Sequence, residues 1–219
     1  MPAPPDDLYD RIREDIASER GARAWLRARP TSTRAVLLGA VAFGSVVTLV
    51  ASMRLEAFFE PRSLGWVLGL VAAITMAAVA MAALLRPVHA DAWSPARRRL
   101  VAAAIALGSL GAITLAGDGT LGGLGTGRCL IVGGVAGLPT FVAATLLDRH
   151  PRRGVLFAAL SATLAGALSV QLLCGAPGLI HLVTEHFGVV ACFGVAYALL
   201  GLALSRSSRP TRTASRPKG

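Results

Sequence analysis

The chain has 219 residues, of which 54% are hydrophobic and only 16% are charged, and its formal net charge is +10. Soluble domains carry about 25% charged residues, and a compact soluble chain with so few would expose large apolar patches, which soluble monomers avoid. The composition therefore argues against a soluble enzyme and a disordered chain and indicates a membrane protein. The basic residues form short clusters between apolar stretches rather than one stripe, which disfavours direct nucleic-acid binding.

The chain begins with a polar arm, residues 1–34. Leu8, Ile12 and Ile16 recur at every fourth position, which predicts a short amphipathic helix with a narrow apolar stripe. Such a helix is too short to be stable alone in water and is expected to fold against a partner's groove. Packing on the membrane surface or on the cytoplasmic loops stays open as the alternative. The predicted partner-binding residues are Leu8, Tyr9, Ile12 and Ile16.

The charge of the arm changes sign along its length. Residues 1–19 carry six acids and two arginines, whereas residues 20–34 carry five arginines and no acid. We expect the basic half, with Trp25, to lie at anionic lipid headgroups. The acidic half then projects into the cytoplasm, where it is suited to a basic partner.

Six apolar segments follow the arm, each 17 to 23 residues long and free of charge in its core. About 20 residues of α-helix cross a hydrocarbon core of about 30 Å, and a segment in lipid must satisfy its own backbone hydrogen bonds, so each is predicted to be a helix. The predicted fold is an all-α, polytopic membrane protein with a transmembrane domain over residues 35–204 and a basic tail over 205–219. The six predicted spans are residues 35–53, 63–85, 100–116, 129–147, 155–173 and 186–204.

The basic residues fall almost entirely on one side of these spans. The arm, the second and fourth connections and the tail hold 19 of the 22 lysines and arginines, whereas the other side holds only Arg54, Arg62 and Arg128. Positively charged connections stay on the cytoplasmic side of a membrane. We therefore predict that both termini are cytoplasmic and that the protein is a multi-pass protein of the bacterial inner membrane.

Small residues recur four apart within the spans. The pairs are Ala40/Gly44, Gly65/Gly69, Gly133/Gly137 and Ala162/Gly166. This spacing lets helices approach closely in lipid. A chain rich in glycine and alanine also produces such pairs by chance, so both interpretations stay open.

Two motifs lie on the predicted outer side. Residues 117–122 fit G-x-G-x-x-G, but they lie between two spans rather than between a strand and a helix, so a flexible connection is predicted. His181, Glu185 and His186 do not have the spacing of H-E-x-x-H or H-x-x-E-H. On an α-helix His181 and Glu185 share a face and His186 is rotated away. Polar capping of the last span is favoured, and a metal or haem site with Cys174 nearby is the alternative.

Two of the three cysteines are a possible disulfide pair. Cys129 begins the fourth span and Cys174 ends the fifth, so both are predicted at the outer face. That compartment is oxidising and adjacent helix ends can approach closely enough, which makes the two a candidate disulfide. Cys192 lies deep in the last span and is expected to be a small packing residue. No cofactor is predicted.

The sequence has none of the residue patterns that are typical of transporters or enzymes. Transporters usually keep ionisable residues inside the membrane, but the cores of these spans have none, and Gln171 near a span end is their most polar side chain. The chain has no P-loop, and His89 and His150 have no nucleophile pattern near them. We therefore predict that the protein is not an enzyme.

Several local features occur together in one known family. They are the arm opening Asp6-Asp7-Leu8-Tyr9-Asp10, Cys129 with Pro139, the basic turn 148–153, a fifth span ending in Cys174 and a histidine-containing start to the sixth. In these features most of the chain resembles the six-span inner-membrane anti-sigma factors of the negative-regulator-of-sigma-F type. The zinc-binding H-x-x-x-C-x-x-C of the soluble anti-sigma domain is absent, so that fold is not implied.

The resemblance implies a negative regulator of transcription. The arm would sequester a cytoplasmic extracytoplasmic-function sigma factor, and a signal at the spans or outer loops, or proteolysis, would release it. The implied partners are the sigma factor and the bilayer. One member of this general type and similar size represses carotenoid synthesis, so that process, or a light or stress response, is an expected target. The alternatives are a small transporter subunit, or a metal- or haem-binding redox protein using His181, Glu185, His186 and the cysteines.

Overall fold

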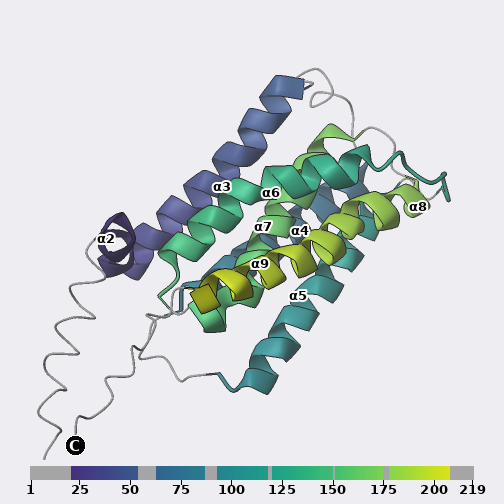
Figure 1. The fold of residues 1–219 in the computed structure, drawn as a ribbon. Helices are drawn as coiled ribbons and strands as arrows, with labels where there is room; N and C mark the ends of the chain where they lie inside the picture. The colour runs from purple at the N-terminus through teal and green to yellow at the C-terminus, as the bar shows by residue number, and fades with distance from the viewer. Residues whose placement is uncertain are drawn as a thin grey trace, which may run out of the picture.

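The computed structural model describes residues 21–53, 63–86, 93–117, 120–149, 151–174 and 178–207. Within these ranges the chain forms helices and irregular connections, with no strand (Figure 1). The predicted stripe of the arm, Leu8, Tyr9, Ile12 and Ile16, and the tail beyond Ser207 lie outside the described residues.

Among the described residues, six helical runs are long and apolar enough to cross a membrane. A short helix, α2 (Ala22–Ala28), precedes them, and Pro30 separates it from the first span. The first five spans are α3 (Thr31–Met53), α4 (Leu64–Leu84), α5 (Pro95–Leu115), α6 (Arg128–Leu147) and α7 (Pro151–Leu173). The sixth consists of α8 (Leu179–His181), the π-helical η2 (Leu182–Phe187) and η3 (Val189–Phe193), and α9 (Gly194–Ser207). For the described residues, the structure confirms the prediction of an all-helical chain with six helical runs long and apolar enough to cross a membrane.

Most spans extend further than hydropathy alone predicts. The α5 helix begins at Pro95 rather than near residue 100, because the Ser94 side chain accepts a hydrogen bond from the Arg97 N–H at 3.2 Å and caps the first turn. A capped first turn tolerates charged side chains, which a hydropathy window leaves out. The sixth helical run begins at Leu179 rather than at residue 186, so His181 and His186 lie within its first turns.

The fifth span, α7, is the centre of the bundle. It contacts α3, α4, α5, α6 and α9, and it is buried along almost its whole length (Figure 1). The other spans therefore surround one helix, and a displacement of α7 would affect all of them.

Three of the four small-residue pairs lie where helices approach closely. A Cβ atom built on Gly166 would overlap the Gly133 carbonyl group, so α6 and α7 meet backbone to backbone. A Cβ on Gly65 would lie 2.7 Å from the Leu115 carbonyl oxygen, so α4 meets α5 in the same way. Gly44 faces open space, so no close approach between helices of this chain occurs at the Ala40/Gly44 pair.

The bundle has two chemically different ends. One end gathers the start of α3, the end of α6 and the start of α7, together with most described arginines, and we call it the arginine-rich end. The other gathers the end of α7 and the starts of α6 and α8, and we call it the cysteine–histidine end.

Candidate functional site

Four side chains that can ligate a metal meet at the cysteine–histidine end. Cys129 lies in the first turn of α6, Cys174 directly follows α7, and His181 and His186 lie at the start of the last span. Their ligand atoms, one sulfur or nitrogen from each, all lie within 4.8 Å of one another. We call these four residues the Cys/His cluster.

The contacts inside the cluster are close. The Cys174 Sγ atom lies 3.1 Å from the His181 Nε2 atom. The rings of His181 and His186 have centroids 5.3 Å apart and planes inclined by 71°. His186 is 1% exposed, and neither of its ring nitrogens has a hydrogen-bond partner in the described part of the chain. The other three members are half-buried.

A π-helical turn brings the two histidines together. An α-helix rotates by about 100° per residue, which places residues i and i+5 about 140° apart. The segment η2 instead has the wider i→i+5 hydrogen bonding of a π-helix, which brings residues five apart close to one face. The prediction that His186 is rotated away from His181 is therefore wrong, because it assumed an α-helical period.

Glu185 is buried beside the cluster but is not one of the four residues. Its carboxylate accepts hydrogen bonds from the Gly127 N–H and, at 3.1 Å, from the Leu130 N–H. N–H groups at the start of a helix have no partner within the helix, so Glu185 caps α6. The prediction that these polar residues cap the last span is corrected, since Glu185 caps the neighbouring helix instead. Glu185 thereby fixes the turn that carries Cys129.

The connection between α5 and α6 forms backbone hydrogen bonds with the start of the last span. The carbonyl oxygens of Thr120 and Leu121 accept hydrogen bonds from the Leu179 and Ile180 N–H groups at 2.8 and 2.9 Å. Gly122 has a φ angle of +61° and lies against Gly178, where a side chain would not fit. The described part of the segment with the G-x-G-x-x-G spacing thus lies between two spans and not between a strand and a helix, while its flexibility stays a prediction.

The three cysteines occupy two kinds of environment. Cys129 and Cys174 share the cluster and are not joined by a disulfide in the structure, so the disulfide stays a prediction. Cys192 is exposed on the outside of the helix at η3. The prediction that Cys192 packs inside the bundle is wrong, because its face of the π-helical segment points away from the other spans.

The arginine-rich end holds the base of the arm. Arg34 is 1% exposed, and its Nη1 atom donates a hydrogen bond of 2.9 Å to the Leu147 carbonyl oxygen at the end of α6. Arg149, just after α6, donates from Nε to the Arg27 carbonyl oxygen at 2.7 Å and from Nη2 to the Arg29 carbonyl oxygen at 3.0 Å. Hydrogen bonds therefore connect the end of α6 and the turn after it to both α2 and the start of α3.

Tryptophans at this end lie beside arginines. The Arg29 guanidinium lies 3.8 Å from the centroid of the Trp25 ring, and Trp25 is 57% exposed. The guanidinium groups of Arg86 and Arg97 lie 4.6 and 5.4 Å from the centroid of the Trp93 ring. Tryptophan and arginine side chains of this kind suit the boundary between lipid and water.

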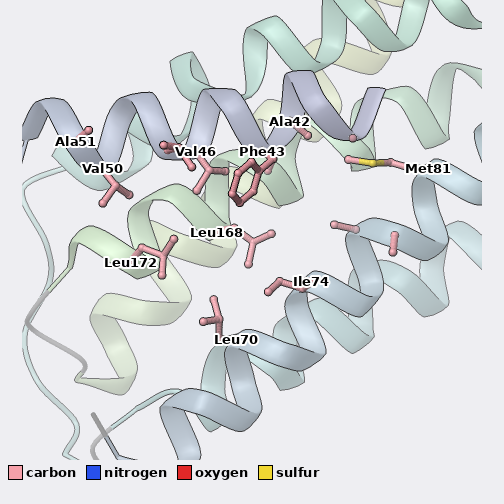
Figure 2. A pocket seen from close by; sticks show the side chains of 15 residues that line it. Ala42, Phe43, Val46, Val50, Ala51, Leu70, Ile74, Met81, Leu168 and Leu172 are labelled. Atoms are coloured by element: carbon pink, nitrogen blue, oxygen red, sulfur yellow. The ribbon is translucent and has the colours of Figure 1, made fainter. Parts of the chain in front are cut away.

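A cavity of about 660 Å³ lies between α3, α4 and α7 (Figure 2). Its lining includes Phe43 of α3, Leu70 and Ile74 of α4, and Leu168 of α7. All its lining residues are apolar, so it offers no polar or charged side chain to a solute. Because transport paths carry such groups, this cavity suits hydrocarbon chains and does not support a transport function.

Comparison with known proteins identifies no relative of this chain. The chain matches no protein-family model, no curated protein and no solved structure. Its function is therefore inferred from the residues and geometry of the two ends.

Proposed function

We propose that the protein is a membrane-bound anti-sigma factor whose cytoplasmic arm sequesters a sigma factor until a signal reaches the cysteine–histidine end. The observation that carries this proposal is that the two ends of α6 contact the two candidate functional regions. Its first turn contains Cys129 of the cluster, and its last carbonyl group holds Arg34 at the base of the arm. One helix thus connects a chemically reactive end with the segment proposed to bind the partner.

The packing of α6 on α7 supports transmission between the two ends. The backbones touch at Gly133 and Gly166, so neither helix can shift far without moving the other. Each helix has a cluster cysteine at one end, and the turn between them carries Arg149 at the other. A change at the cluster that moves these helix ends would therefore also move Arg149 and alter its hydrogen bonds to α2.

The charge distribution supports a cytoplasmic arm. The 19 lysines and arginines of the arginine-rich side, against three on the other, favour cytoplasmic termini in a bacterial inner membrane. The Cys/His cluster would then face the oxidising outer compartment, which suits a thiol-based sensor. Carotenoid synthesis, or a light or stress response, is the regulated process that the resemblance to anti-sigma factors suggests.

The apolar stripe of the arm is proposed to bind the sigma factor. Burying each of Leu8, Ile12 and Ile16 in a groove contributes roughly 1.5–3 kcal/mol at most, and ordering the arm subtracts part of this. Replacing Ile12 and Ile16 together with Asp removes the burial and forces charge into the groove. A loss of about 3 kcal/mol already weakens binding more than a hundredfold.

Co-purification from solubilised membranes, with mass spectrometry of the partner, tests this proposal. Wild-type protein is expected to retain a sigma factor, whereas Ile12→Asp/Ile16→Asp, at equal membrane abundance, is expected to lose it and leave the target promoter constitutively active. Arg13→Ala, on the other face of the arm, is the matched control and should retain the partner. A double mutant that still keeps the promoter silent would show that the arm is not the binding element.

The second candidate is a metal- or haem-binding redox membrane protein, and the Cys/His cluster is the observation that favours it. The two candidates differ in what the arm does. In a redox protein, changes in the arm would leave the activity at the cluster intact and would release no transcription factor.

A further inference from the structure

We infer that the Cys/His cluster is a binding site for a single transition-metal ion of the zinc type, with Cys129, Cys174, His181 and His186 as its four ligands. All four ligands belong to the cysteine–histidine end, so this end would bind the ion whichever partner the arm binds.

The donor set and its spacing fit one tetrahedral ion. Zinc binds cysteine sulfur at about 2.3 Å and histidine nitrogen at about 2.0–2.1 Å, so neighbouring ligand atoms of a tetrahedral site are about 3.3–3.8 Å apart. In the cluster the Cys174 and His181 atoms are already 3.1 Å apart, and all four ligand atoms lie within 4.8 Å of one another. No pair of ligand atoms is therefore more than about 1.5 Å further apart than in a tetrahedral zinc site.

His186 supplies an independent indication of a ligand. A buried polar group without a hydrogen bond destabilises the fold, so native structures rarely retain one. His186 is 1% exposed, and neither ring nitrogen has a partner among the described residues. A metal ion at the centre of the cluster would accept the lone pair of one of these nitrogens.

The charges around the cluster also suit a divalent ion. Two thiolates and two neutral imidazoles neutralise a doubly positive ion, so the filled site carries no net charge at the end of an apolar bundle. A further charge beside the cluster, the Glu185 carboxylate, already accepts hydrogen bonds from the first turn of α6. Glu185 is thus positioned to hold the backbone around Cys129 rather than to complete the ligand set.

A disulfide or a simple hydrogen bond accounts for fewer of the four residues than a metal ion does. A disulfide would use Cys129 and Cys174 and leave both histidines without a role. Hydrogen bonds link Cys129 to Cys174 and Cys174 to His181, but they leave His186 buried and without a hydrogen bond among the described residues. A metal ion gives all four residues a function.

Metal titration of the full-length, chemically reduced protein in detergent tests the inference. With Co²⁺ as the probe, we expect one ion per chain, with the visible bands of tetrahedral cobalt and the charge-transfer absorption of cobalt–thiolate bonds, and displacement by one equivalent of Zn²⁺. Substitutions of residues that only support the ligands typically weaken metal binding about 10- to 100-fold. Cys129→Ser, Cys174→Ser and His186→Gln each remove a ligand and should weaken Co²⁺ binding by more than this.

Cys192→Ser is the matched control, because Cys192 is exposed and outside the cluster. It should bind Co²⁺ as wild type does, and size-exclusion profiles should show that each variant remains folded. Wild-type protein that binds no Co²⁺ or Zn²⁺, or ligand variants that bind as tightly as wild type while remaining folded, would overturn the inference. A Co²⁺ spectrum without thiolate charge transfer would also overturn it.

Discussion

The two ends of the bundle are built in different ways. At the arginine-rich end, Arg34 and Arg149 donate to backbone carbonyl groups and hold the start of the chain against the end of α6. At the cysteine–histidine end, four side chains from three segments converge on one point, and Glu185 steadies one of those segments. One end is suited to anchoring a segment, and the other to binding or chemistry. The proposed function uses this difference: the cluster would receive the signal, and the arginine-rich end would hold the arm.

The largest expected effect concerns which side of the membrane each end occupies, and it is all-or-none. Reporter fusions after Arg98, Arg152 and Arg212 should read as cytoplasmic, because the arginine-rich connections stay inside. Fusions near Arg62, Gly122 and Pro177 should read as external. An external C-terminus would contradict the six-span topology and remove the assignment of the two ends.

The next effect concerns the contact between α6 and α7. Gly166→Ala places a methyl group against the Gly133 carbonyl group and forces the helices apart, which should lower the free energy of unfolding by about 3 kcal/mol, the upper part of the range for overpacking. Gly44→Ala adds the same methyl group where nothing lies within 4 Å and is the matched control. Thermal unfolding in one detergent measures both. Equal midpoints for the two variants would show that the close approach is not needed for stability.

A somewhat smaller effect is expected at the base of the arm. Arg34→Met removes the charged donor to the Leu147 carbonyl oxygen, and such a bond contributes about 1.5–3 kcal/mol. The start of α3 should loosen, and limited proteolysis should then cut the arm faster than in wild type. Arg23→Gln, at an exposed position of α2, should leave the cutting rate unchanged. If both variants are cut at the wild-type rate, Arg34 does not hold the arm.

The smallest effect concerns the protection of two cysteines. In untreated intact cells, Cys129 and Cys174 should react with a thiol reagent at least about tenfold more slowly than after the protecting metal or bridge is removed, a difference of about 1.4 kcal/mol. A chelator should expose both if the inferred metal protects them, whereas exposure by a reductant alone would identify the predicted disulfide. Rapid labelling of Cys129 and Cys174 in untreated cells would exclude both forms of protection.

Hydropathy and charge made much of the fold predictable. A helix that crosses lipid needs a run of about 20 apolar residues, which is a local property, so all six spans could be predicted from their own residues. The first and last residues of each helix were less predictable, because a capping residue such as Ser94 extends a helix into charged sequence. Pairs of small residues were ambiguous for a related reason: Gly44 and Gly166 look alike in the sequence and differ only in what faces them.

The sequence by itself determined an all-helical membrane protein with a polar arm and an asymmetric distribution of arginines. It also indicated Cys129, Cys174 and the histidine segment as residues of interest, but without their arrangement. Only the tertiary structure decided that a π-helical turn directs His181 and His186 to the same point and that Glu185 caps a different helix from its own. Span length and charge are properties of consecutive residues, whereas a cluster depends on contacts between helices and on the helical period at one turn. Neither of these is encoded in a local pattern of residue types.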